Sequence, residues 1–393
     1  MSHFIFSDEK QKQMRKNLLS SLLFILIIVS FYSCTHSTAN IEAPKKKISV
    51  GVFNGNGASA VCVLETMEAL KIDSGISPRE ISAVDIMANE LDNLDVIIFP
   101  GGSGSKENNN MGTLGADKVR AFGQQKGKGI IGICAGGYLL GSTPNYPNLG
   151  IVPLTHIREH YNRGRGLISF SMNEKGKELF PENKDFDSVY MQYYDGPIFN
   201  ISDTSSVQVL ATVNTDIATK KNDPFGVTPG KPAILSYTYG QGQIYIIIGH
   251  PEATHGMRWM VPRMARLSVN QAIISYHPEL VKPDAYSKEL LFIPELNKFE
   301  KDQFWNLSDE DPYAIIIALD HLKNLHSRPS IRWSIGLLRH HDVKVRIAAA
   351  EYLLYTEYTN ALPDLKQAYE NEQNKQAKKQ LGEFYNRLNA YVQ

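Results

Sequence analysis

A succession of short apolar strands, separated by helical segments, limits the fold of the first half of this chain more than any other feature. The expected order is strand 47–53, helix 58–70, strand 81–86, strand 94–99, helix 114–126 and strand 129–133. These strands are rich in Val and Ile and lack a polar face, so both faces must be buried, as in a parallel sheet covered by helices on either side. We therefore predict an α/β fold with a doubly wound, mostly parallel sheet.

The strands that follow have a different pattern, in which apolar and polar residues alternate more regularly. Such alternation is typical of antiparallel strands, and we expect them to extend the parallel sheet. A helix over about 257–275 then closes a domain that we place at 47–278. The alternating strands are expected near 167–172, 188–193, 207–213, 233–237 and 243–248.

The C-terminal part of the chain has a helical pattern throughout. Residues 279–308 are rich in Pro and Lys and are expected to form an irregular connector, and Asp311-Pro312 then gives a helix start. The segment 342–350 resembles the opening of a HEAT-type repeat, so we predict a small all-α, HEAT-like domain over 309–393. Because helical repeats bury a common core only when they stack, this domain is expected either to pack on the main domain or to bind a protein partner.

The N-terminus has the pattern of a bacterial export signal. Basic residues between 10 and 16 precede an apolar run over 18–32, which is shorter than the roughly 20 residues that a spanning helix needs. Ser33-Cys34 resembles a lipobox, so residues 1–34 are predicted to be a lipoprotein signal peptide, with lipid attached to Cys34 and a tether over 35–46. The protein is then expected to be anchored in the bacterial cell envelope, facing the periplasm or outside the inner membrane. An uncleaved N-terminal anchor and plain secretion are the alternatives.

Charge and cysteine content exclude several classes of partner. Lys and Arg together number 41, as do Asp and Glu, so no global charge favours nucleic acid as a partner. The three cysteines cannot form a disulfide framework, and their spacing matches no zinc pattern. We therefore expect no cofactor and no metal.

The segment 132–138, Gly-Ile-Cys-Ala-Gly-Gly-Tyr, is the first candidate for chemistry. Cys134 is expected at a sharp turn between the strand 129–133 and a helix, where a nucleophile is exposed above the sheet and where the helix N-terminus favours a thiolate. The backbone N–H of Ala135 would point at an oxyanion, and the turn at Gly101-Gly102 is the candidate for the second donor, through Gly102. A buried structural cysteine is the alternative.

A second motif supplies the groups that a cysteine nucleophile needs. His250-Pro251-Glu252 directly follows an apolar strand, and residues i and i+2 of an extended segment project to the same side. Glu252 can therefore orient the imidazole of His250 while that imidazole faces the thiol. Tyr194 and Asp195, at the end of another expected strand, could also reach this site and bind substrate.

The motifs at 132–137 and 249–252 resemble those of the class I glutamine amidotransferase superfamily. Together with 99–102 and 194–197, they are similar to the N-terminal domain of eukaryotic-type biotin-protein ligases, over about residues 47–276. The resemblance implies a flavodoxin-like fold, with Cys134 as nucleophile, His250 as general base and acid, and Glu252 as its orienting group.

One residue departs from the amidotransferase pattern. These enzymes carry Gln four residues after the nucleophile, where it helps to hold glutamine, whereas this chain has Tyr138. We therefore predict a cysteine hydrolase or amidase that cleaves a C–N bond of a small-molecule or peptide amide through a thioester, with Tyr138 as a substrate-binding residue. The alternative is a catalytically silent module that uses its helical tail for partner contact.

Two further sequence features could indicate other chemistry. Cys62 lies among Val and Leu in the first helix and is expected to be a buried hydrophobe. His156 and His160 fit a zinc protease pattern, but the segment between Pro153 and Gly164 is too short for a confident helix. A loop at the pocket rim is the preferred interpretation, with arginines at 158, 163 and 165 placed to contact an anionic ligand.

Overall fold

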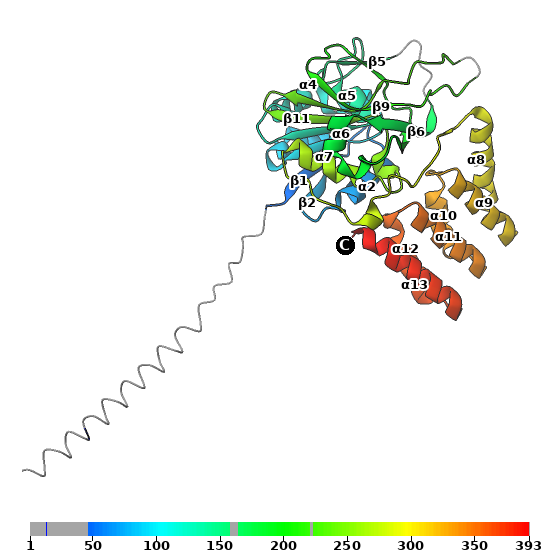
Figure 1. Ribbon diagram of the computed structural model, residues 1–393. Coiled ribbons are helices and arrows are strands. Elements are labelled where there is room, and N and C mark those ends of the chain that lie inside the picture. Colours follow the sequence, from blue (N-terminus) through cyan, green and yellow to red (C-terminus); the bar gives the residue numbers. More distant parts are fainter. Residues whose placement is uncertain (1–12, 14–45, 158–163, 221–222, 393) are drawn as a thin grey trace, which may run out of the picture. The chain divides into compact units, whose positions relative to one another are not determined.

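The computed structural model describes residue 13 and residues 46–157, 164–220 and 223–392 (Figure 1). The predicted signal peptide apart from residue 13, including Cys34, and all of the predicted tether except Lys46 lie outside the described residues. Lys47–Gln393 form one compact unit. In the described part of the chain, no helix combines the length and the apolar character needed to cross a bilayer.

A ten-stranded sheet forms the centre of this unit. Its strand order is β12-β6-β9-β10-β11-β4-β3-β1-β2, with β7 paired to β6. The strands β2, β1, β3, β4 and β11 run parallel, whereas β10, β9, β6, β7 and β12 add an antiparallel extension. The strands are β1 (Ile48–Phe53), β2 (Ile76–Ile81), β3 (Val96–Phe99), β4 (Gly129–Ile133), β6 (Arg165–Met172), β7 (Val189–Tyr194), β9 (Val207–Val213), β10 (Pro232–Tyr239), β11 (Gly242–Ile247) and β12 (Leu290–Leu291). The predicted α/β fold with a mostly parallel sheet is thus confirmed.

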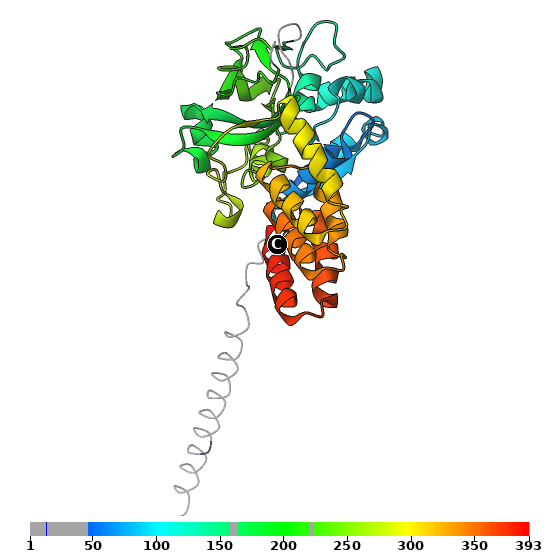
Figure 2. The same ribbon diagram turned by 90° about the vertical axis from the view of Figure 1, so that its right-hand side faces the viewer.

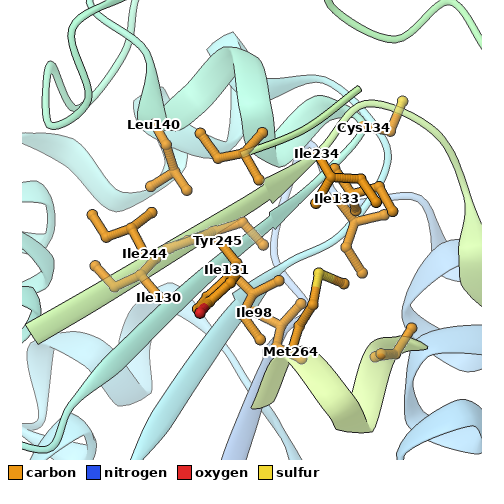
Figure 3. Packing of buried hydrophobic residues seen from close by; sticks show 14 of the residues in the cluster. Ile98, Ile130, Ile131, Ile133, Cys134, Leu140, Ile234, Ile244, Tyr245 and Met264 are labelled. Atoms are coloured by element: carbon orange, nitrogen blue, oxygen red, sulfur yellow. The ribbon is translucent and has the colours of Figure 1, made fainter. Parts of the chain in front are cut away.

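Helices cover the parallel part of the sheet, and a small second sheet pairs β5 (Leu154–His156) with β8 (Phe199–Ile201). Figure 3 shows Leu140 of α5 on one side of the strands and Met264 of α7 on the other, with Ile130 and Ile131 of β4 between them. All four side chains are fully buried, so β4 lies in the middle of the core. The helices of this domain are α2 (Ala60–Leu70), α3 (Ala83–Met87), α4 (Gly104–Gly123), α5 (Ala135–Leu140), α6 (Glu174–Leu179) and α7 (Met260–Ser268).

Three expected elements differ from the structure. The strand predicted at 81–86 is wrong, because Ser82 and Asp85 form a capping box that starts α3 directly after β2. The helix predicted at 257–275 ends at Ser268, and Asn270 shortly afterwards has a left-handed φ of 55° that no helix can continue. The helix predicted at 114–126 begins earlier, at Gly104, with a break at Gly112.

The C-terminal region is wholly helical, as predicted (Figure 2, yellow to red). The Asp311 carboxylate accepts a hydrogen bond from the backbone N–H of Tyr313, which confirms the expected helix start. Residues 294–306 form α8, although an irregular connector was expected there, because Pro294 starts a helix at its first position. The HEAT-type resemblance and the domain boundaries stay predictions. The helices are α8 (Pro294–Asn306), α9 (Pro312–Asn324), α10 (Ile331–Leu337), α11 (Val343–Tyr355), α12 (Leu362–Asn371) and α13 (Lys375–Asn389).

Buried polar contacts fasten the helical region to the α/β domain. The Glu357 carboxylate lies 2.8 Å from Nδ1 of His255, and the Glu357 carbonyl accepts a 2.6 Å hydrogen bond from Arg258. The hydroxyl of Thr359 donates to the carboxylate of Glu68 in α2. The helical region was expected either to pack on the main domain or to bind a protein partner. The structure shows it packed on the main domain, and binding of a protein partner stays a prediction.

The close packing around α5 predicts a stability effect that depends on position. A Cβ atom on Gly136 would lie 2.2 Å from the carbonyl oxygen of Phe99, whereas one on Gly336 in α10 would meet nothing within 4 Å. We expect Gly136→Ala to lower the free energy of unfolding by about 1–3 kcal/mol. Gly336→Ala, the matched control, should leave it unchanged or raise it by up to about 1 kcal/mol. Urea denaturation of the two variants measures the difference, and equal stabilities would contradict the contact at Gly136.

Candidate active site

Cys134 lies on a strained turn between β4 and α5. Its backbone has φ 50° and ψ −104°, a combination that costs a residue other than glycine about 1–3 kcal/mol. Its N–H donates a 2.9 Å hydrogen bond to the carbonyl of Ile247 in the neighbouring strand β11. The side chain is 5% exposed, and its Sγ donates to the carbonyl of Tyr194 at 3.5 Å. In Figure 3 the sulfur of Cys134 lies beyond Ile133, at the tip of the strand.

His250 and Glu252 follow β11 at the same edge of the sheet. Nδ1 of His250 lies 2.7 Å from Oε1 of Glu252, and the two side chains are 9% and 0% exposed. The segment Pro251–Ala253 is a 3-10 turn rather than the extended segment that was expected, yet the two side chains still meet. Two hydrogen bonds fix the backbone of His250. Its N–H donates to the carbonyl of Gln192, and its carbonyl accepts a hydrogen bond from the hydroxyl of Thr254.

The charge state of His250 depends on the groups around its ring. Burial lowers the pKa of His250, but the negative charges of Cys134 and Glu252, together with hydrogen bonds to the thiols of Cys134 and Cys62, raise it well above its ordinary value. The raised pKa means that an imidazolium is favoured in this site near neutral pH. A protonated imidazole beside a thiol stabilises the thiolate, which is the reactive form of cysteine.

Cys62 is part of the same site, so its prediction as a buried hydrophobe is wrong. It is half-buried in α2, lines the same cavity as Cys134, and its Sγ lies within 4.8 Å of a ring nitrogen of His250. Burial raises the pKa of the Cys62 thiol. The sequence held a usable signal, because the first turn of a helix that follows a parallel strand lies at the edge where ligands bind in such sheets.

The site contains a group of side chains that could hold a metal ion. The Cys62 thiol, a His250 ring nitrogen and a Glu252 carboxylate oxygen lie within 4.8 Å of one another, and no second group of this kind exists among the described residues. The hydrogen bond between His250 and Glu252 already accounts for most of this closeness, so we assign no metal to it.

A cavity of about 980 Å³ opens above Cys134. Every predicted site residue that the structure describes lines it, apart from Glu252, which is buried behind His250. The predicted residues in its wall are Cys134, His250, Gly102, Ala135, Tyr138, Tyr194 and Asp195. Sequence reasoning missed the contribution of the helical region, which adds Glu300, Ser327, Arg328, Ile331, Arg332 and Tyr358.

Tyr138 occupies the place where the amidotransferases carry glutamine. Its hydroxyl donates a 3.1 Å hydrogen bond to the carbonyl of Asp195, which itself has a left-handed φ of 52°. The ring also lies edge-on to His156, with the ring centroids 4.8 Å apart. Tyr138 is therefore fixed across one side of the cavity.

The structure around His156, the first histidine of the zinc protease pattern, does not match that pattern. His156 belongs to strand β5 rather than to a helix, and its Nδ1 lies 2.7 Å from the hydroxyl of Thr143. Residues 158–163, which include the second histidine and two of the three arginines, lie outside the described residues. Arg165, the third arginine, does line the cavity.

The charges around His250 predict how its proton responds to a change at Glu252. Glu252→Gln removes one negative charge, so the pKa of His250 should fall toward or below its ordinary value of about 6.5. NMR titration of the imidazole nitrogens measures this pKa. Because the pKa of His250 is raised in the folded protein, protonation of His250 stabilises the fold. This contribution to the free energy of unfolding is fully present below about pH 6.5 and is lost as the pH rises through the folded-state pKa. The Glu252→Gln variant should not show this pH-dependent loss of stability. An unchanged pKa in the variant would contradict the coupling.

Comparison with known proteins places this site in context. No protein-family model matches the chain. Its sequence is similar to the pyridoxal 5'-phosphate synthase subunit PdxT of Listeria monocytogenes. The subunit from serotype 4b strain F2365 is 28% identical over 176 residues, which cover 44% of this chain and 79% of the subunit. The serovar 1/2a subunit is 29% identical with the same coverage.

Solved structures give a weaker comparison. The glutaminase domain of Trypanosoma brucei CTPS with bound acivicin aligns over 58% of this chain and 96% of that domain, at 10% identity and a TM-score of 0.42. The finer resemblance to biotin-protein ligases stays a prediction. The sequence similarity to PdxT, a class I glutamine amidotransferase, supports a place for this chain in the glutamine amidotransferase-like superfamily.

Proposed function

We propose that this protein is a lipid-anchored amidase or hydrolase of the bacterial envelope that cleaves a C–N bond with Cys134, His250 and Glu252. The observation that carries the proposal is the buried contact between His250 and Glu252, on an imidazole that also reaches the thiol of Cys134 beneath an open cavity. A nucleophile, a base and a group that orients the base are the parts that acyl transfer requires.

The reaction that we propose proceeds through a thioester. The Cys134 thiolate attacks the amide carbonyl, and the oxyanion that forms accepts hydrogen bonds from the backbone N–H groups of Ala135 and Gly102. The imidazolium of His250 gives its proton to the departing amine as the C–N bond breaks. Water then attacks the thioester with neutral His250 as base, the C–S bond breaks, and the carboxylic acid leaves.

The substrate that we propose is larger than free glutamine. Tyr138 replaces the residue that holds glutamine in the amidotransferases, and its hydroxyl is already engaged by Asp195. A cavity of about 980 Å³ is at the upper end of the range for small-molecule sites, roughly 300–1,000 Å³. Both observations favour a peptide-like amide.

The proposed location rests on the N-terminal sequence. Lipid attached to Cys34 would hold the domain at a membrane surface, with residues 35–46 as a tether. Metabolic labelling with a fatty-acid analogue should mark the wild-type chain and leave Cys34→Ala unlabelled, whereas equal labelling of both chains would count against the anchor.

Thiol reactivity tests the catalytic proposal. At pH 6.5 an ordinary thiol with a pKa near 8.5 is only about 1% thiolate, and a neighbouring imidazolium favours the thiolate form of a thiol. Cys134 should therefore react with iodoacetamide faster than glutathione does, and His250→Ala should slow it by roughly tenfold to a hundredfold. Mass spectrometry of the alkylated peptides follows Cys134 by itself.

Cys62→Ser is the matched control, because it removes the other thiol of the site and keeps the base. We expect this variant to retain rapid alkylation of Cys134. If Cys134 in the wild-type chain reacts no faster than glutathione, the catalytic proposal is wrong. The domain would then be a binding or scaffold module, a role that the presence of Tyr138 in place of glutamine favours.

A further inference from the structure

Thr254 connects strand β7 to the backbone of His250. Its side chain is fully buried. The Thr254 hydroxyl donates a 2.6 Å hydrogen bond to the carbonyl of His250 and accepts a 2.9 Å hydrogen bond from the backbone N–H of Gln192 in β7. One hydroxyl group therefore satisfies two buried backbone groups that are distant from each other along the chain.

This hydroxyl takes the place of a direct hydrogen bond between two extended segments. Gln192 and His250 form an isolated antiparallel bridge, in which the His250 N–H donates a 2.8 Å hydrogen bond to the Gln192 carbonyl. In an ordinary hydrogen-bonded pair of this kind, the two residues exchange both bonds directly. Here the route from the Gln192 N–H to the His250 carbonyl passes through the hydroxyl of Thr254. His250 can thereby leave the sheet for the turn at Pro251–Ala253 with both of its backbone groups bonded.

Strand β7 also contacts the reactive thiol. The carbonyl of Tyr194, two residues after Gln192, accepts the 3.5 Å hydrogen bond from Sγ of Cys134. The same strand therefore contacts the thiol at Tyr194 and the backbone of the candidate base at Gln192. Thr254 provides one of the two links between Gln192 and His250, so it helps to set the imidazole relative to the sulfur.

A hydroxyl with two buried backbone partners cannot be replaced by an apolar group without loss. Valine has nearly the shape of threonine, but it would leave the Gln192 N–H and the His250 carbonyl without this partner. Buried backbone groups nearly always find a partner, so the segment would shift to reach one. A shift of the His250 backbone changes the contacts of its ring with Glu252 and Cys134, and a displacement of about 1 Å can cost about a hundredfold in rate.

We propose that Thr254 is a positioning residue for the candidate base, and that its hydroxyl fixes the direction in which the His250 imidazole leaves the sheet edge. Glu252 holds the ring of His250, and Thr254 holds the peptide group from which the side chain extends. The effect of Thr254 on the reaction rests on the proposed function, whereas its effect on the imidazole does not.

The same substitution at two matched positions tests the proposal. Thr228 is 1% exposed, and its hydroxyl also has two backbone partners, accepting a 2.8 Å hydrogen bond from the N–H of Ile217 and donating one of 2.8 Å to the carbonyl of Thr215. Thr228 is not among the described residues that line the cavity. Thr254→Val and Thr228→Val should therefore lose similar stability toward urea, whereas only Thr254→Val should alter the site.

Two measurements on the full-length chain report on the site. NMR titration with nitrogen-labelled histidine, in which His250 is assigned from the spectrum of His250→Ala, should show a lower pKa of His250 in Thr254→Val and the wild-type pKa in Thr228→Val. The pKa falls because the ring moves away from the negative charges that raise it. Alkylation of Cys134 by iodoacetamide at pH 6.5 should slow by roughly threefold to tenfold in Thr254→Val, and it should keep its wild-type rate in Thr228→Val.

A conservative variant separates hydrogen bonding from packing. Thr254→Ser keeps the hydroxyl and loses the methyl group, so it should recover most of what Thr254→Val loses. If Thr254→Val does not fold, Thr254→Ala takes its place, because alanine brings no apolar branch against the two backbone groups. The proposal is overturned if Thr254→Ser is as impaired as the valine variant, or if Thr228→Val matches Thr254→Val in both measurements.

The outcomes separate this proposal from the proposed function. Rapid alkylation of Cys134 in the wild-type chain, with an unchanged pKa of His250 in Thr254→Val, would leave the amidase and remove the role of Thr254. Slow alkylation of Cys134 in the wild-type chain, with a pKa of His250 that falls in Thr254→Val and not in Thr228→Val, would leave the positioning role and remove the chemistry.

Discussion

The parallel pairing of β4 with β11 is the constraint on which the candidate site depends. The two strands are in register with Ile133 opposite Ile247, so the chain leaves both strands at the same edge of the sheet. The hydrogen bond from the Cys134 N–H to the carbonyl of Ile247 extends the ladder between these strands by one residue and anchors the strained turn to β11. His250 then needs only three residues beyond β11 to bring its ring to the sulfur. A slip of this register would separate the Cys134 thiol from the His250 imidazole, whatever the local motifs.

The helical region continues the same site rather than standing apart from it. Its contacts with the α/β domain include buried polar ones, at Glu357, Glu300 and Arg328, and an apolar one, since Leu64 of α2 packs against the core of the helical region. Hydrogen-bonded charge pairs add geometric specificity to such a contact. α2 receives several of them, at Glu65 and Glu68, and α2 also carries Cys62 into the site. The same helix, α2, therefore contacts the helical region and positions Cys62 beside His250.

The parts of the site that sequence analysis could predict are those fixed by local order along the chain. Cys134 directly follows β4, and His250 lies three residues beyond the end of β11, so the parallel sheet alone brings them to one edge. Glu65 and Arg328 are 263 residues apart, and no periodicity indicates that they meet. The strand wrongly placed at 81–86 shows the opposite error, since Ser82 and Asp85 already formed a helix-start pattern that the apolar residues around them obscured.

In the proposed enzyme, the reacting groups and the walls of the cavity come from different elements of the structure. The elbow at Cys134 and the contact between His250 and Glu252 belong to the sheet edge. Tyr138 closes one side of that cavity by its hydrogen bond to Asp195, while α8 and the segment before α10 form another. A change of substrate in such an arrangement needs no change at the sulfur. Under the proposed function, Tyr138 and the helical wall would together shape the cavity for an amide longer than that of free glutamine.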